Sequence, residues 1–475
     1  MTASQKAGWG ELLKEGRLAR FALLCLGIWL NAADALMTAT IMPSVARDIG
    51  GYAYFGWTIA GFILGAILAG ASAGQISVRL GVSSSMVVAA AVYVAGCVVS
   101  ALSPDIAFFL AGRLMQGVGA GWIVGLSYVA IGTMFPESLW ARVLASVSGV
   151  WGVATLLSPL IGGVFAEAGL WRAAFWIFAA QGVGFGLAAF LLLSPVKPRT
   201  VPGRLPVRQL TVLTAGILCI AAAGLVSGPL QAMLLGSSGL MFLGLFVHLD
   251  SRAGSALLPR VSSDPMSAAA AGYVMIFTLS AASIGYSVYG SAIMQALFGT
   301  SPLLAGYVLG TEAMAWTLCA LAVAGLRAEW HGVFIRLGAL AVLAGVASLA
   351  FTMRSGPLAA IAVSSIFLGG GFGLSWSFIA RRIISSVEGE DRALASSAIP
   401  TMQLVGGAAG SAGAGAIANF LGFAGGIDAG RAAGASFWLF ASFVPVALIG
   451  LAAAWRLAAC DSDQTSPRAE SSSFT

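Results

Sequence analysis

Apolar residues fill long stretches of this chain, and polar residues gather in the short segments between them. Each stretch has about twenty residues, the length that an α-helix needs to cross a bilayer. The pattern therefore predicts an all-α integral membrane protein with fourteen transmembrane helices. The predicted spans are 20–43, 53–74, 84–103, 107–134, 139–165, 171–194, 210–227, 230–248, 267–297, 302–325, 333–353, 357–380, 393–420 and 433–456.

A polar, proline-rich segment at 194–206 divides the chain into two similar halves. We expect four units: an N-terminal six-helix bundle (1–195), a linker with two extra transmembrane helices (196–265), a C-terminal six-helix bundle (266–459) and a disordered cytoplasmic tail (460–475). Three glycines of the fourth span recur at the same spacing in the twelfth, which favours an internal duplication of the kind that many transporters have. These glycines are Gly117, Gly119, Gly121, Gly369, Gly371 and Gly373.

The composition excludes a water-soluble fold, because 59% of the residues are hydrophobic and only 9% are charged, whereas soluble domains have about 25% charged residues. The net charge of +6 does not indicate nucleic-acid binding, because the basic residues lie in loops that become cytoplasmic if the N-terminus is inside. We expect a multi-pass protein of the cytoplasmic (inner) membrane with both termini in the cytoplasm. Loop charge fits twelve spans as well as fourteen, because removing both of the weak spans 210–227 and 230–248 preserves the bias.

The chain lacks the sequence signatures of catalysis and cofactor binding. There is no phosphate-binding loop, and no nucleophile–base pair is visible. The five cysteines have no metal-site or disulfide spacing. We therefore expect neither an enzyme nor a bound cofactor or metal.

Three charged residues, Asp34, Arg113 and Glu312, interrupt the apolar spans at similar depth. A charge at the centre of a membrane helix costs about 3 kcal/mol on insertion scales, and such residues usually serve transport. Arginine stays protonated at physiological pH, whereas a carboxylate can titrate. We expect Arg113 to be a fixed positive centre and Asp34 to change its proton occupancy; a static ion pair is the alternative. Glu312 is either a second proton site, a partner for cationic cargo, or a carboxylate satisfied by hydroxyls such as that of Thr311.

Several short motifs occur in order along the N-terminal half. Their residues are Asp34, Pro43, Arg113, Gln116, Gly117, Gly119, Gly121, Gly149, Gly152, Ser158, Pro159, Gly162, Gly163, Trp171 and Arg172. This series resembles the major facilitator superfamily and is most similar to its fourteen-span drug:proton antiporter branch. Two positions depart from the branch, which usually has Asn at Ala39 and Gly at Ser158.

The resemblance implies two gating elements. One is the loop between the second and third spans, with Gly74, Arg79 and Gly81, but Val78 replaces the acid of the family motif and the basic residues after Gly81 are absent. The outward-open state is therefore expected to lose part of its support. The other element is the fifth span, which is expected to pack tightly against a C-terminal helix. Its gating residues are Gly149, Gly152, Pro159, Gly162 and Gly163.

Aromatic and amide side chains of the spans are candidates for lining a central cargo cavity, since apolar walls with a few polar groups suit amphipathic ligands. Most aromatics on membrane helices instead face lipid or other helices. The candidates are Trp29, Asn31, Gln116, Trp122, Tyr286, Tyr289, Gln295, Trp316, Trp376 and Gln403.

These features predict proton-coupled efflux of small amphipathic or lipophilic compounds by alternating access. The expected partners are a small-molecule substrate, protons and the lipid bilayer, and the expected functional form is a monomer. Two alternatives remain open. One is export of a specific lipid, siderophore or metabolite, or uncoupled transport of such cargo. The other is a membrane scaffold or sensor with the same fold.

Overall fold

The computed structural model describes residues 16–193, 205–226, 228–253, 257–259, 262, 264–387, 391–427 and 429–459. Every regular element in these ranges is a helix. The N-terminal half holds α1 (Arg17–Ile49), η2 (Tyr52–Tyr54), α2 (Phe55–Leu80), α3 (Val82–Ala101), α4 (Ile106–Met134), α5 (Glu137–Glu167) and α6 (Trp171–Leu192). A hairpin of α7 (Val207–Ala223) and α8 (Pro229–Ser251) follows. The C-terminal half holds α9 (Ala268–Phe298), α10 (Pro302–Val323), η4 (Ala328–Trp330), α11 (His331–Ser355), α12 (Leu358–Ser385), α13 (Asp391–Phe420), η5 (Phe423–Gly425), α14 (Ala429–Ala441) and α15 (Val444–Ala459).

A helix lies at each of the fourteen predicted ranges, so the all-helical class is confirmed. Within the described ranges, twelve helical segments are long and apolar enough to cross a membrane. The 17-residue α7 is shorter, and α13 is not among the twelve. The count of fourteen spans therefore stays a prediction, and the predicted tail at 460–475 lies outside the described residues.

Two predictions need correction in detail. The predicted last span, 433–456, lies within one candidate membrane span, Ala432–Ala459. Its helix is interrupted between α14 and α15, because Pro445 lies in the first turn of α15, a position where proline begins a helix but cannot continue one. Gly74 and Arg79 do not lie in a loop, because α2 extends to Leu80. The connection to α3 is Gly81 alone, which adopts φ +84°, a conformation that glycine reaches without strain.

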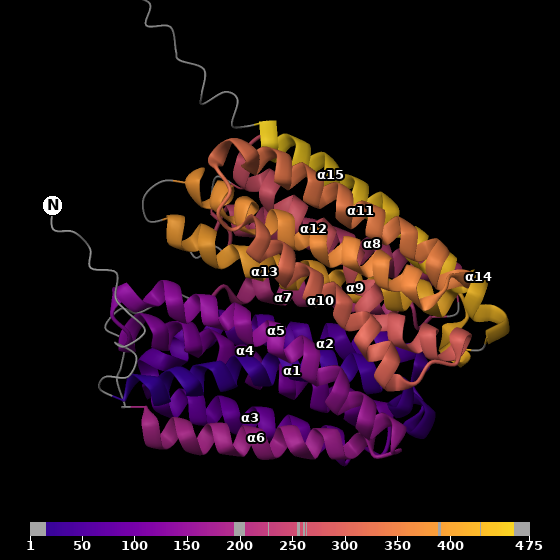
Figure 1. Cartoon of the computed structure of the whole chain (residues 1–475), viewed down its shortest axis with the longest axis horizontal. Coiled ribbons are helices and arrows are strands. Elements are labelled where there is room, and N and C mark those ends of the chain that lie inside the picture. Colours follow the sequence, from indigo (N-terminus) through magenta and orange to yellow (C-terminus); the bar gives the residue numbers. More distant parts are fainter. Residues whose placement is uncertain are drawn as a thin grey trace, which may run out of the picture.

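The two halves use the same packing plan. In the N-terminal half α4 packs against α2 and α3, α1 against α5, and α3 against α6. In the C-terminal half α12 packs against α10 and α11, α9 against α13, and α11 against α15. Figure 1 shows the indigo-to-magenta helices of the first half on one side and the orange-to-yellow helices of the second on the other. The halves meet mainly where α5 packs against α10 and where α2 packs against α13.

The repeated glycines explain why the plan recurs. An added Cβ at Gly117 or Gly121 would overlap the backbone of α2, and one at Gly119 would overlap the backbone of α3. Likewise, an added Cβ at Gly369 or Gly373 would overlap the backbone of α10, and one at Gly371 would overlap the backbone of α11. Alternate glycines of one helix therefore admit two neighbouring helices at backbone distance, as small residues do in membrane bundles.

The fifth span meets the C-terminal half through only part of its predicted gating motif. A Cβ at Gly163 would lie 2.5 Å from Leu303 Cα on α10, and one at Gly306 of α10 would lie 2.8 Å from Pro159 Cβ. A Cβ at Gly162 would approach the Met37 carbonyl oxygen of α1 at 3.1 Å. By contrast, the Cβ positions of glycines 149 and 152 have either no neighbour within 4 Å or only ordinary contact. The close contact is therefore confined to one end of α5.

The α5–α10 contact predicts a difference between two glycines of the same motif. Gly163→Ala should lower the stability of the protein by about 1–3 kcal/mol, because the methyl group overpacks the interface. Gly149→Ala should leave the stability unchanged or raise it slightly, because the site is open and alanine is the better helix former. Thermal unfolding of both detergent-purified variants would measure the difference. Equal midpoints would contradict the packing described above.

Candidate functional site

A buried ion pair joins α1 and α4 inside the N-terminal half. Arg113 Nη1 lies 2.7 Å from Asp34 Oδ1, and the exposed fractions of the two side chains are 1% and 0%. The Arg113 guanidinium also stacks over the Phe62 ring of α2, with Cζ 4.5 Å from the ring centroid, a favourable cation–π arrangement. Asp34 and Arg113 therefore form an ion pair, and both side chains are buried inside the protein.

Three further donors converge on the Asp34 carboxylate. Thr38 Oγ1 donates to Oδ1 at 3.2 Å, and Tyr93 Oη and Gln116 Nε2 each donate to Oδ2 at 3.2 Å. Together with Arg113, they supply four donors to a group with about four acceptor positions. Each acceptor position of the Asp34 carboxylate therefore has a donor within the cluster.

The orientation of the Gln116 amide follows from its own partners. Arg113 Nη1 and Ser100 Oγ both donate to Gln116 Oε1, at 3.0 and 3.1 Å. The amide nitrogen therefore faces Asp34 and the Cys97 thiol, whose sulfur accepts at 3.2 Å. All of these side chains are buried. Gln116 was expected to line a cargo cavity, but it lies within the ion-pair cluster and links α3 to α4.

Glycine contacts bring the cluster together. A Cβ at Gly96 of α3 would collide with the Gln116 backbone, and one at Gly112 of α4 would collide with Ser100. Close approach of α3 and α4 is what allows short polar side chains to span the gap. Nε of Arg113 has no hydrogen-bond partner among the described residues, so the guanidinium depends on Asp34 and Gln116. Because an unpartnered buried charge is far more costly than a paired one, these contacts are interdependent.

Sequence reasoning missed Thr38, Tyr93, Cys97 and Ser100. Thr38 follows Asp34 by one helical turn, and this spacing alone places the two side chains on one face. The three residues of α3 carry no charge, so the search for membrane-embedded charges passed over them. Their contribution depends on which face of α3 meets α1 and α4, and a single apolar helix does not reveal that face.

Glu312 lies apart from this cluster. It belongs to α10, where its backbone is in close contact with Gly369 of α12. Its side chain is half-buried, and no ion pair joins it to another described residue. Thr311, the expected hydroxyl partner, instead contacts Ser365 and donates to the Val308 carbonyl. The structure therefore does not bring the three membrane charges together.

Three of the other candidate cavity residues join helices by hydrogen bonds: Trp29 donates to Gln181 at 2.9 Å, Trp122 to Ser72 at 2.7 Å and Tyr286 to the Val308 carbonyl at 3.1 Å. Gln295 donates to Ser291 within α9, Tyr289 stacks on Phe55, and Trp316 stacks on Phe372 beside Trp376. Asn31 and Gln403 are half-buried.

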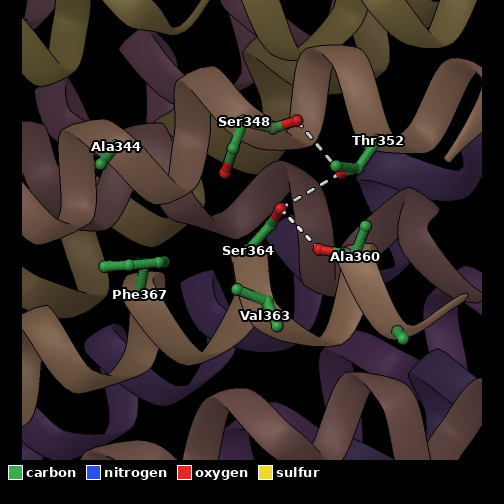
Figure 2. A pocket seen from close by; sticks show the side chains of 8 residues that line it. Ala344, Ser348, Thr352, Ala360, Val363, Ser364 and Phe367 are labelled. Carbon is green, nitrogen blue, oxygen red and sulfur yellow. Dashed lines mark hydrogen bonds between the residues drawn. The ribbon is translucent and has the colours of Figure 1, made fainter. Parts of the chain in front are cut away.

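Hollows on the described surface include one near the predicted cavity residues and one in the C-terminal half. One, of about 520 Å³, is lined by Trp29, Cys25 and Leu26 of α1 and by residues 146, 149, 150 and 153 of α5. The other, of about 470 Å³, lies between α11 and α12 (Figure 2). Thr352 and Ser364 in it hydrogen-bond each other at 3.2 Å, and both hydroxyls also donate to helix carbonyls. Trp29 is thus the one predicted cavity residue that lines either hollow.

Known proteins resemble this chain in sequence and in fold. The sequence profile of the Major Facilitator Superfamily matches residues 24–335. A probable multidrug-efflux transporter of Mycobacterium tuberculosis is 31% identical over 98% of this chain and 99% of its own length. An uncharacterized MFS-type transporter of the same organism is 27% identical over 88% of this chain and 62% of its own length.

Solved structures agree in fold. A D-xylose-proton symporter superposes with a TM-score of 0.66 at 17% identity, over 93% of this chain and 97% of that one. A peptide transporter of the POT family, in complex with sulfate, gives a TM-score of 0.66 at 14% identity, over 93% and 95%. The profile match, the full-length relative and the shared fold together establish that this chain belongs to the major facilitator superfamily.

Proposed function

We propose that the protein exports small amphipathic or lipophilic compounds across the cytoplasmic membrane by alternating access, driven by inward proton flow. In this proposal fourteen helices span the membrane, both termini face the cytoplasm, and a monomer is the working unit. Membership of the superfamily and the full-length similarity to a probable multidrug-efflux transporter support efflux. Proton coupling is our inference from the ion-pair cluster.

The buried pair of Asp34 and Arg113 is the observation that carries the coupling. Arg113 cannot release its proton at physiological pH, whereas the carboxyl group can gain one. Protonation of Asp34 would leave a buried guanidinium without its counter-ion, a state that is strongly unfavourable. The bundle would then relax to an arrangement that offers Arg113 other partners. Proton binding is in this way tied to a change in helix packing.

The contacts between the halves suggest which state this conformation represents. They gather where α5 ends and α10 begins, at Gly163 and Leu303, and where α2 begins and α13 ends, at Gly56 and Gly415. With the N-terminus in the cytoplasm, these contacts lie at the outer end of the molecule. We infer an outward-closed state that would receive cargo from the cytoplasm, which suits an exporter.

The C-terminal half offers a site for cargo of a particular character. Glu312 is half-buried, with Trp316 one turn further along α10, and Trp316 stacks on Phe372 with centroids 4.8 Å apart. A carboxylate beside aromatic rings attracts lipophilic cations by charge and by cation–π contact. We assign Glu312 to cargo recognition. A second proton site is the alternative role.

Replacing Asp34 by Asn should strongly reduce transport against a gradient, because the amide keeps the size of the side chain but cannot take up a proton. We expect pH-gradient-driven uptake of ethidium, a lipophilic cation, into inverted proteoliposomes to fall about tenfold or more, the effect of losing over ~1.4 kcal/mol. Asp48→Asn is the matched control on the same helix, since Asp48 pairs with Arg172 at a half-exposed site. This control should transport like the wild type.

Undiminished uphill transport by Asp34→Asn would remove the coupling role. Loss of transport by both variants would assign the effect to general damage at α1 and would also count against it.

Glu312→Gln should reduce transport of a lipophilic cation far more than that of a neutral amphipathic compound. At a separation of about 4 Å and an effective dielectric constant of about 20, two opposite unit charges attract each other by several kcal/mol. Glu312→Gln removes this attraction for a desolvated cation. We expect a tenfold or larger rise in apparent KM for ethidium, by the conversion of ~1.4 kcal/mol per decade. Glu329→Gln, at an exposed ion pair with Arg327, serves as the control. Equal losses for both cargo types would favour proton coupling at Glu312 instead.

A further inference from the structure

The end at which the halves meet is closed by a row of aromatic rings. Tyr52 stacks on Phe55, Phe55 stacks on Tyr289, and Tyr289 contacts Phe423, with centroid separations of 5.6, 5.8 and 6.0 Å. The first two rings belong to the N-terminal half and the last two to the C-terminal half. Passage between the halves at this end requires the row to separate between Phe55 and Tyr289.

Backbone contacts reinforce the aromatic row. Ser411 Oγ of α13 donates to the Gly56 carbonyl of α2 at 2.8 Å, and Asn419 Nδ2 donates to the Ala53 carbonyl at 2.7 Å. An added Cβ at Gly56 would lie 2.9 Å from Gly415 Cα. We call the aromatic row and these α2–α13 contacts the gate. Any opening at this end must break both hydrogen bonds.

The outer end of α7 lies against both sides of the gate. Trp57 Nε1 of α2 donates to the Ala221 carbonyl of α7 at 3.3 Å. Three residues later, a Cβ at Gly224 would overlap the Ala416 backbone of α13 and approach its Cβ at 3.1 Å. One turn of α7 therefore contacts the N-terminal half through a hydrogen bond and the C-terminal half through close packing.

The hairpin packs mainly against the C-terminal half, because α7 packs more extensively against α13 than against α2. Helices α7 and α8 meet at Gly216 and Gly239, where a Cβ on Gly239 would lie 2.8 Å from the Gly216 carbonyl oxygen. At the other end of α8, the buried Asp250 carboxylate accepts from the backbone N–H groups of Leu257 and Leu258, both at 2.8 Å. This cap ties the end of α8 to Leu257 and Leu258. The contact of Trp57 with Ala221 is thus the point where the anchored hairpin meets the opposite half.

We propose that the α7–α8 hairpin is a strap that holds the gate closed. It goes beyond the proposed export function but rests on its alternating-access mechanism, because a strap matters only if the gate opens. The strap adds one hydrogen bond and one packed interface that must be lost before α2 leaves α13. It raises the population of the closed state and slows opening at this end.

Hydrogen exchange measured by mass spectrometry tests the strap without cargo or a pH gradient. Gly224→Leu should push α7 away from α13 and speed exchange in segments 52–58 and 411–425. We expect about a fivefold increase, the factor for roughly 1 kcal/mol of lost stability. Gly236→Leu is the matched control on the same hairpin, because a Cβ there has no neighbour within 4 Å, and it should exchange like the wild type.

Trp57→Phe is the second variant, since it keeps an aromatic ring and removes only the donor to Ala221. It should raise exchange in the same two segments even if Gly224→Leu does not fold. Exchange within α11 should stay unchanged in all variants. Unchanged gate exchange in Trp57→Phe, or equal increases in the gate and in α11, would overturn the strap. These outcomes do not depend on proton coupling, so failure of the Asp34 prediction and failure of the strap are separately visible.

Discussion

The ion pair between Asp34 and Arg113 is the interaction on which the N-terminal half depends. Neither charge is tolerable alone at this depth, so α1 and α4 must keep their relative rotation for both to be satisfied. The polar side chains around the pair convert that requirement into a specific geometry, because Gln116 has its amide oriented by Ser100 and its nitrogen aimed at the carboxylate. The cluster thereby adds a charged, directional contact to the helix packing and to the hydrogen bonds that Trp29 and Trp122 make between helices.

Among the described residues of the other half, the same helix packing holds no buried ion pair. Ser365 stands at the position that duplication assigns to the counterpart of Arg113, and it contacts Thr311 and the Val308 carbonyl. Tyr286 donates to that same carbonyl at 3.1 Å. Repeated glycines therefore preserve the backbone plan while the polar centre differs: charged in the first half and made of hydroxyl groups in the second. The two halves therefore differ in charge at equivalent positions although their helices pack alike.

Much of the helical fold could be predicted from the sequence, because a membrane helix can be recognised from its length and apolar character alone. The approximate positions of the long helices followed from that reasoning, and the opposite charges at similar depth pointed to an ion pair between Asp34 and Arg113. The placement of Gln116 and the involvement of Tyr93 could not be predicted, since both depend on how apolar helices rotate against one another. Glu312 shows the same limit, because similar depth in the membrane does not mean proximity when two residues belong to different halves.

The single-residue connection at Gly81 has a mechanical consequence. Helix α2 carries Gly56 and Trp57 at one end and Phe62 against Arg113, and after Gly81 the chain returns at once as α3, whose Tyr93 touches Asp34. Because Gly81 is the only residue between the two helices, α3 must move with α2 when α2 tilts. The two helices thus form one unit that contacts the opposite half at Gly56 and the buried ion pair at Phe62 and Tyr93.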